Sequence, residues 1–204
     1  MSSNLKKPLL IFDLGNILFE LEGVEAFWPE DSNQPELCQA RWNSSEVAYL
    51  LETGKIDNFA DFYRDICAEL NIKLKPDEFE KAFLGIIGEP FSGTEKMLEE
   101  LAGNYRLMIL SNTNEPHWLY CLDKLPLTKY VETSFLSHEI GAMKPDDMIY
   151  EQVLEKLKVD PENIYYFDDK EENVVVARKH GMKAYRSWGG ETLRQQLRKL
   201  GFLH

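Results

Sequence analysis

The chain has 204 residues, of which 44% are hydrophobic and 12% aromatic, so it can bury a sizeable core and is not a disordered polypeptide. Its 23 Lys and Arg face 35 Asp and Glu, and the formal net charge of −12 repels phosphate backbones, which argues against nucleic acid as its partner. The length fits one domain, or one core domain with a small insertion.

Membrane and export signals are not expected. The longest apolar run near the start, residues 8–12, is far shorter than the ~20 residues that a membrane-spanning helix needs. The polar lead at residues 1–7 does not resemble a signal peptide. Three cysteines without close pairing (Cys38, Cys67 and Cys121) predict reduced thiols in a cytoplasmic protein. The sequence does not define an oligomeric state.

Short apolar runs that end in polar residues predict buried parallel strands. They lie at residues 8–13, 105–110, 134–136, 163–167 and 183–185. Helical patterns fall between or after them, at residues 93–101, 146–157, 170–180 and 192–200. Strands that alternate with helices predict an α/β fold, a Rossmann-like core with a parallel sheet covered on both faces.

The segment 18–90 has a different character, with little strand signal and helical patterns at residues 44–51, 57–70 and 77–87. We therefore expect a helical cap domain at residues 18–90, inserted into a core domain made of residues 1–17 and 91–204. Such a cap would form a lid over the edge of the sheet.

Polar side chains follow three of the predicted strands. Asp13 ends the first run and precedes a flexible Leu-Gly-Asn turn, Ser111 begins a Ser-Asn-Thr-Asn segment after the second, and Asp168 and Asp169 follow another. Lys144 precedes a helix and can face the same edge. Because ligands of such sheets bind beyond the carboxyl ends of the strands, we expect these groups to meet there.

The residue types in this group have a shared chemistry. Carboxylates from two strands suit Mg²⁺, which prefers oxygen ligands. The Ser111 hydroxyl, the Asn112 amide and the Lys144 ammonium suit a phosphoryl group. A carboxylate nucleophile with a metal, a cation and a hydroxyl indicates a site for phosphoryl transfer.

This pattern resembles the haloacid dehalogenase-like (HAD) hydrolases. Four motifs match in order between residues 8 and 188, namely Phe12-Asp13-Leu14-Gly15-Asn16, Leu110-Ser111-Asn112, Lys144-Pro145 and Phe167-Asp168-Asp169. The cap resembles the small helical type that follows the first motif. Within the family, the motif words resemble those of the subgroup that contains α-D-glucose-1-phosphate phosphatases.

The resemblance implies that Asp13 is the catalytic nucleophile and forms an aspartyl phosphate. It implies that Ser111, Asn112 and Lys144 bind the phosphoryl oxygens, and that Lys144 also balances the charge of Asp13. A small phosphorylated metabolite, such as a sugar phosphate, is the expected substrate.

The resemblance also implies a Mg²⁺ site. Asp13 and Asp169 would be its carboxylate ligands, Gly15 would contribute its backbone carbonyl, and Asp168 would be a further ligand or would support the others.

Gly15 is a departure from the family, whose phosphatases usually have a second Asp two residues after the nucleophile. That Asp protonates the leaving group and then activates water, and such help is worth ~10²–10⁴-fold in rate. Either another residue replaces it, with Glu20, Glu22 and His117 as candidates, or the substrate has a good leaving group, as a sugar 1-phosphate has.

Two other functions stay open. Dehalogenases of the family also lack the second Asp and need no metal, although the pair Asp168-Asp169 favours a phosphatase. The alternative that is not primarily an enzyme is a catalytically weak module that binds a phosphorylated ligand. Most aromatic residues at 18–90 are expected in the cap core, while Trp28, Arg41, Trp42 and the segment 52–55 can shape specificity.

Overall fold

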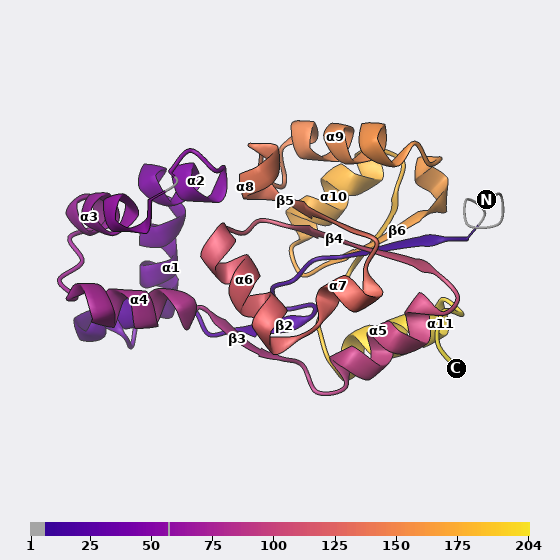
Figure 1. Cartoon of the computed structure of the whole chain (residues 1–204), viewed down its shortest axis with the longest axis horizontal. Helices are drawn as coiled ribbons and strands as arrows, with labels where there is room; N and C mark the ends of the chain where they lie inside the picture. Colours follow the sequence, from indigo (N-terminus) through magenta and orange to yellow (C-terminus); the bar gives the residue numbers. More distant parts are fainter. Residues whose placement is uncertain (1–6, 57) are drawn as a thin grey trace.

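In the computed structural model, which describes residues 7–56 and 58–204, a lobe of helices lies beside a part built on a sheet (Figure 1). Within these ranges five strands form one parallel sheet in the order β5-β4-β1-β6-β7. Their bounds are β1 (Leu9–Phe12), β4 (Arg106–Ser111), β5 (Thr133–Leu136), β6 (Ile164–Asp168) and β7 (Lys183–Arg186). All the predicted core strands, and with them the α/β fold, are confirmed.

The register of the sheet brings the predicted polar groups to one edge. Phe12, the last residue of β1, pairs with Ile109 of β4 on one side and with Phe167 of β6 on the other. Asp13 and Asp168, each the next residue along, therefore emerge side by side at the carboxyl end of the sheet.

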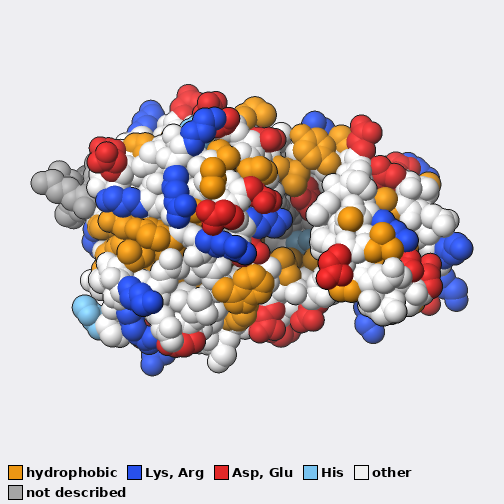
Figure 2. All heavy atoms as spheres, turned by 180° about the vertical axis from the view of Figure 1, so that it is seen from behind, with side chains coloured by type: hydrophobic (Ala, Val, Ile, Leu, Met, Phe, Trp, Pro, Cys, Tyr) orange, Lys and Arg blue, Asp and Glu red, His pale blue; other side chains and the backbone are white. Residues whose placement is uncertain are grey.

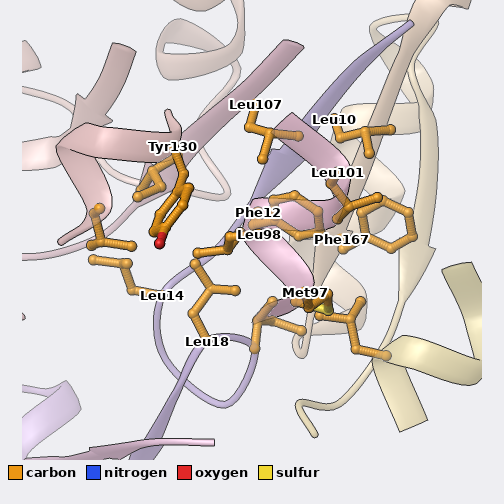
Figure 3. Close-up of a cluster of buried hydrophobic side chains, with 14 of the residues drawn as sticks. Leu10, Phe12, Leu14, Leu18, Met97, Leu98, Leu101, Leu107, Tyr130 and Phe167 are labelled. Atoms are coloured by element: carbon orange, nitrogen blue, oxygen red, sulfur yellow. The ribbon is translucent and has the colours of Figure 1, made fainter. Parts of the chain in front are cut away.

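Alternate residues of the sheet pack against helices on its two faces, so its strands are buried on both sides. Leu10 and Phe12 face a cluster (Figure 3) to which four helices contribute: α5 (Thr94–Ala102), α6 (Glu115–Lys124), α7 (Leu127–Tyr130) and α11 (Glu191–Lys199). Leu9 and Ile11 face a second cluster, formed with α8 (Ser137–Ile140), α9 (Asp147–Leu157) and α10 (Glu171–Lys179).

The helical lobe, which we call the cap, lies between β2 (Phe19–Leu21) and β3 (Ile87–Pro90). These two strands pair antiparallel and carry the chain into and out of it. The cap helices are α1 (Pro35–Asn43), α2 (Glu46–Glu52), α3 (Phe59–Leu70) and α4 (Pro76–Leu84). They enclose an aromatic core of their own, centred on Phe27, Phe62, Phe79 and Phe83. The limits 18 and 90 stay a prediction as domain boundaries.

Some local expectations were wrong. The helix expected at residues 77–87 ends at Leu84, where Gly85 caps it, and Ile87 instead begins β3. Helix α1, which is largely polar in sequence, and helices α6, α7 and α8 were not predicted. The polar lead up to residue 6 and Asp57, the first residue of an expected helix, lie outside the described residues.

None of the helices in the described ranges is both long and apolar enough to cross a membrane. Cys38, Cys67 and Cys121 are all unpaired thiols, as predicted.

Candidate active site

Lys144 lies at the centre of the polar group beyond the sheet. Its side chain is almost completely buried, and its Nζ lies 3.0 Å from Asp13 Oδ1 and 2.7 Å from Asp168 Oδ2. The same Nζ donates to the carbonyl of Leu110, the residue before the end of β4, at 3.0 Å. One cation thus links the ends of three neighbouring strands.

The charged groups of this cluster shift the pKa values of one another. Burial raises the pKa of Asp13 to about 6. The negative charges of Asp168 and Asp169 act in the same direction, and Lys144, which lowers this pKa, offsets only part of the increase. Burial also opposes the charge on Lys144, but the two carboxylates outweigh it and hold the pKa of Lys144 above its ordinary value. Burial works against the Asp168 carboxylate too, yet Lys144 and several hydrogen bonds keep its pKa below the usual range.

Both oxygens of Asp168 are occupied by donors from the protein. Oδ2 accepts hydrogen bonds from Lys144 Nζ, from the hydroxyl of Tyr166 and from Asn173 Nδ2, and Oδ1 accepts from the backbone N–H of Lys170 and from Asn173 Nδ2. Asp168 is therefore fixed in one orientation. The contribution of Tyr166 was not anticipated, because a Tyr in an apolar strand usually indicates core packing.

Asp169 points toward the turn after β1, where Asn16 Nδ2 donates to its Oδ2 at 3.0 Å. One oxygen each from Asp13, Asp168 and Asp169 lies within 4.8 Å of the others, close enough to share a cation. Beside them Asn173 is 2% exposed, and its Oδ1 is buried without a hydrogen-bond partner among the described residues. An arrangement of anionic and neutral oxygens of this kind suits Mg²⁺.

The residues after β4 form the other wall of the site. Ser111 is buried and borders the same space as Asp13. The side chain of Asn112 is bonded to the backbone of Lys144 in both directions: its Nδ2 donates to the carbonyl and its Oδ1 accepts from the N–H, each at 2.8 Å. Asn112 thus fixes the loop that carries Lys144.

These groups surround a narrow well of about 90 Å³, lined by Asp13, Gly15, Ser111, Lys144, Asp169 and Asn173 among others. The well adjoins a chamber of about 460 Å³ between cap and core, and Lys144, Lys170 and Asn112 line both spaces. The hollow between the two parts of the molecule is visible in Figure 2. The cap side of the chamber includes Trp42, Ser45, Tyr49 and Glu52.

Several residues singled out in the sequence lie elsewhere. Glu20 and Glu22 are exposed and border neither the well nor the chamber. Arg41 pairs with Asp31 at 2.6 Å and lies over the ring of Trp28, so both Arg41 and Trp28 belong to the packing of the cap.

His117 borders the chamber, but both of its ring nitrogens are bonded. Nε2 donates to the carbonyl of Phe83 at 2.7 Å, and Nδ1 accepts from Asn114 Nδ2 at 3.1 Å. Burial lowers the pKa of His117 to about 4. A neutral imidazole therefore joins α6 of the core to α4 of the cap, and it is not a free acid or base.

Comparison with known proteins assigns the chain to a protein family. The family model described as haloacid dehalogenase-like hydrolase matches residues 10–186, which is most of the chain. The chain belongs to the haloacid dehalogenase-like hydrolases, as the sequence motifs predicted, and is a hydrolase of that family.

Individual relatives extend over nearly the whole chain. A D-ribitol-5-phosphate phosphatase of Bacteroides thetaiotaomicron is 24% identical over 92% of this chain and 95% of its own length. The magnesium complex of a HAD family enzyme from the same organism matches with a TM-score of 0.79 and 26% identity, covering 94% of this chain and 98% of the other. An L-2-haloacid dehalogenase, PA0810, has the same fold, with a TM-score of 0.66 and 17% identity over 96% and 99% of the two chains.

Proposed function

We propose that this protein is a Mg²⁺-dependent phosphatase that hydrolyses a small phosphate monoester, such as a sugar or polyol phosphate, through an aspartyl phosphate on Asp13. The observation that carries this proposal is the position of Lys144, which lies 3.0 Å from Asp13 Oδ1 and 2.7 Å from Asp168 Oδ2 inside a narrow well. A buried cation beside a buried carboxylate suits an anionic substrate and a charged nucleophile.

The donor set supports a resident Mg²⁺. Asp13 and Asp169 would be its carboxylate ligands, together with the Gly15 carbonyl, and Asp168 lies within the same cluster of oxygens. Since both oxygens of Asp168 already accept hydrogen bonds, its main role in this proposal is to hold Lys144 in place. When bound, the ion supplies charge neutralisation for the phosphoryl group.

The residues of the chain then have separate roles in the reaction. Asp13 Oδ1 accepts from the backbone N–H of Leu14 at 2.7 Å and faces Lys144, which leaves Oδ2 without a hydrogen bond from the described residues. Oδ2 is thus the atom that attacks phosphorus. Lys144 and Ser111 bind phosphoryl oxygens. The side chain of Asn112 holds Lys144 in position through two hydrogen bonds to the backbone of Lys144.

The chamber supports a small, polyhydroxylated leaving group. Its lining combines amides and hydroxyls with an aromatic wall, as in Gln39, Asn43, Ser45, Tyr49 and Trp42. The phosphatase that the chain resembles over 92% of its length is named for a polyol phosphate, which fits this chemistry. The unpaired thiols fit a reducing, cytoplasmic setting.

Hydrolysis of p-nitrophenyl phosphate tests the proposal, with Mg²⁺ or with EDTA, and with Asp13→Asn as the inactive variant. We expect turnover that requires both Mg²⁺ and Asp13, and a phosphoryl adduct on the peptide that carries Asp13 after acid quench. Turnover that survives Asp13→Asn would contradict the proposed nucleophile.

Dehalogenation of a 2-haloacid is the competing activity, favoured by Gly15 at the position where the family's phosphatases have an acid. In that case Asp13 would displace halide from 2-chloropropionate without any metal. Halide release in EDTA, with no release of phosphate from p-nitrophenyl phosphate, would assign the protein to this class instead.

A further inference from the structure

Glu52, the last residue of α2, is a carboxylate that the cap contributes to the lining of the chamber above the well. In the described parts of the chain, the carboxylates that line this chamber are Glu52 and, from the core, Glu172. The chamber and the well share Lys144 and Lys170, so a substrate whose phosphoryl group enters the well has room for its other part in the chamber that Glu52 lines.

The surroundings of Glu52 leave its carboxyl group available. It is half-buried and forms no hydrogen bond or ion pair with the described residues. Burial raises the pKa of Glu52 to about 7, and the cation that opposes this effect is Lys170, at the start of α10. At neutral pH the group can therefore both release and accept a proton.

Other charged groups near α2 are already engaged or face elsewhere. From α3, the carboxylate of Glu69 accepts hydrogen bonds from the Ser45 hydroxyl and from the backbone N–H of Glu46, at the opposite end of α2. From α8, His138 and Glu139 line a separate cavity on another side of the α2 terminus. Within the chamber itself the charged neighbours are Lys144, Lys170 and Glu172, and His117 is neutral.

We propose, on the basis of the proposed phosphatase function, that Glu52 is the general acid and base of the reaction and replaces the acid that is missing at Gly15. The groups considered from sequence do not fill this role, since Glu20 and Glu22 are exposed outside the chamber and His117 is bonded at both ring nitrogens.

The proton transfers balance over two steps. Asp13 Oδ2 forms a bond to phosphorus while the P–O bond to the alcohol breaks, and the leaving oxygen takes the proton of the Glu52 carboxyl group. The Glu52 carboxylate then takes a proton from water as the water oxygen attacks phosphorus and the P–O bond to Asp13 breaks. Inorganic phosphate, the Asp13 carboxylate and the protonated Glu52 result.

Glu52→Gln tests this role with two substrates that differ in their leaving groups. With ribitol 5-phosphate, whose alkoxide is a poor leaving group, kcat should fall ~10²–10⁴-fold with little change in KM. With p-nitrophenyl phosphate the first step needs no acid, so one equivalent of p-nitrophenol should appear in a burst at the wild-type rate. Steady turnover should then be slow, because the aspartyl phosphate lacks its base and accumulates.

The matched control is Glu46→Gln, which removes the same charge from the exposed first residue of α2 and should leave both rates unchanged. The pH profile of kcat/KM should lose its limb near pH 7 in Glu52→Gln alone. Thermal unfolding of each variant shows that the fold is retained.

Three results would overturn the role of Glu52: wild-type rates in Glu52→Gln, a raised KM at unchanged kcat, or equal losses on both substrates without a burst. A raised KM would make Glu52 a substrate contact, and equal losses would make its role structural. Failure of the proposed function is distinguishable, because then the wild-type protein itself shows no turnover that depends on Mg²⁺ and Asp13.

Discussion

The side-chain amide of Asn16 donates a hydrogen bond of 3.0 Å to Asp169 Oδ2 and so joins the turn after β1 to the end of β6, 153 residues away. Asn16 adopts a left-handed backbone conformation, with φ of 55°, which Asn tolerates better than most residues. Its carbonyl also accepts from the N–H of Gly189 at 2.7 Å. The conformation of this turn therefore sets the direction in which Asp169 points.

Asn16→Ala should weaken the apparent affinity for Mg²⁺ by ~10–100-fold, because partners that orient a metal ligand contribute to affinity on that scale. A titration of p-nitrophenyl phosphate turnover with Mg²⁺ measures the effect. Saturating Mg²⁺ should restore most of the turnover, since the Asn16 side chain forms its hydrogen bond with Asp169 and not with Asp13 or Lys144.

Asn71→Ala is the matched control for this change. Asn71 also has a left-handed conformation, with φ of 53°, but it caps α3 in the cap and is exposed. Both variants should lose roughly 1–2 kcal/mol of unfolding free energy through backbone strain. An equal loss of Mg²⁺ affinity in the two would show that the hydrogen bond to Asp169 has no specific effect.

The sequence predicted the strand ends correctly because their apolar runs and terminal polar residues are local patterns. Asp13, Ser111, Lys144 and the pair at 168–169 could be placed at one edge from topology alone. The support around them is different. The hydrogen bond between Asn16 and Asp169 joins residues far apart in the sequence, and the Tyr166 hydroxyl that reaches Asp168 two residues along β6 belongs to a residue type that also packs in apolar cores.

The cap was harder to predict for a related reason. Helix α1 has the sequence Pro-Glu-Leu-Cys-Gln-Ala-Arg-Trp-Asn, and only Cys38 and Trp42 of it are buried, so it lacks an apolar stripe. Strands β2 and β3 are three and four residues long and form a separate two-stranded sheet. The segment 52–55 was expected to shape specificity, but an acid and base role for Glu52 could not be predicted, because its place in the lining of the chamber depends on how the cap sits on the core.

Removing the central cation should be costly for folding as well as for activity. In Lys144→Met the carboxylates of Asp13 and Asp168 stay buried without their partner, and a loss of ~3–5 kcal/mol in the free energy of unfolding is expected. Urea denaturation measures this loss. Lys179→Met, which breaks an exposed pair with Asp147, should cost much less, because solvent screens that pair. Similar losses in both variants would contradict the central role of Lys144.

Tyr166→Phe should destabilise the protein by ~1.5–3 kcal/mol, because it removes a hydrogen bond to the buried, charged Asp168. Tyr185→Phe on the neighbouring strand is a suitable comparison, since the Tyr185 hydroxyl forms no hydrogen bond with the described residues. The two unfolding midpoints should differ clearly. If they coincide, the Tyr166 hydroxyl does not stabilise the carboxylate.

The buried imidazole of His117 should make stability depend on pH. Its pKa is lowered to about 4 in the folded protein, so between pH 6.5 and pH 4 the unfolded chain binds a proton that the folded chain does not. Stability from this group is therefore complete above pH 6.5 and is lost as the pH falls, by about 3 kcal/mol in all.

His117→Phe removes this titration and keeps a ring stacked on Phe83. Urea denaturation at several values between pH 7 and pH 4 should give a shallower fall in unfolding free energy for the variant than for the wild type. At pH 7 the variant should be the less stable of the two, since it lacks the hydrogen bond to the Phe83 carbonyl. Identical slopes would mean that His117 takes up a proton in the folded state as easily as in the unfolded one.

Restoring the family's second Asp should show what Gly15 costs the reaction. A Cβ atom at Gly15 would lie 2.9 Å from Leu21 Cδ1, so Gly15→Asp needs space that Leu21→Ala provides. Leu21 is 40% exposed, and its truncation alone should cost little stability. Both residues line the well, so the new carboxyl group would lie beside the leaving oxygen.

In a Glu52→Gln background, adding Gly15→Asp with Leu21→Ala should raise the turnover of an alkyl phosphate by at least about tenfold. That is a small part of the ~10²–10⁴-fold that an acid and base contributes to the rate. Leu21→Ala in the same background is the reference, since it changes the well without adding an acid. Steady p-nitrophenyl phosphate turnover should rise as well, because the new carboxylate can activate water. An absence of recovery, with Mg²⁺ affinity unchanged, would show that a proton donor is not what the Glu52 variant lacks.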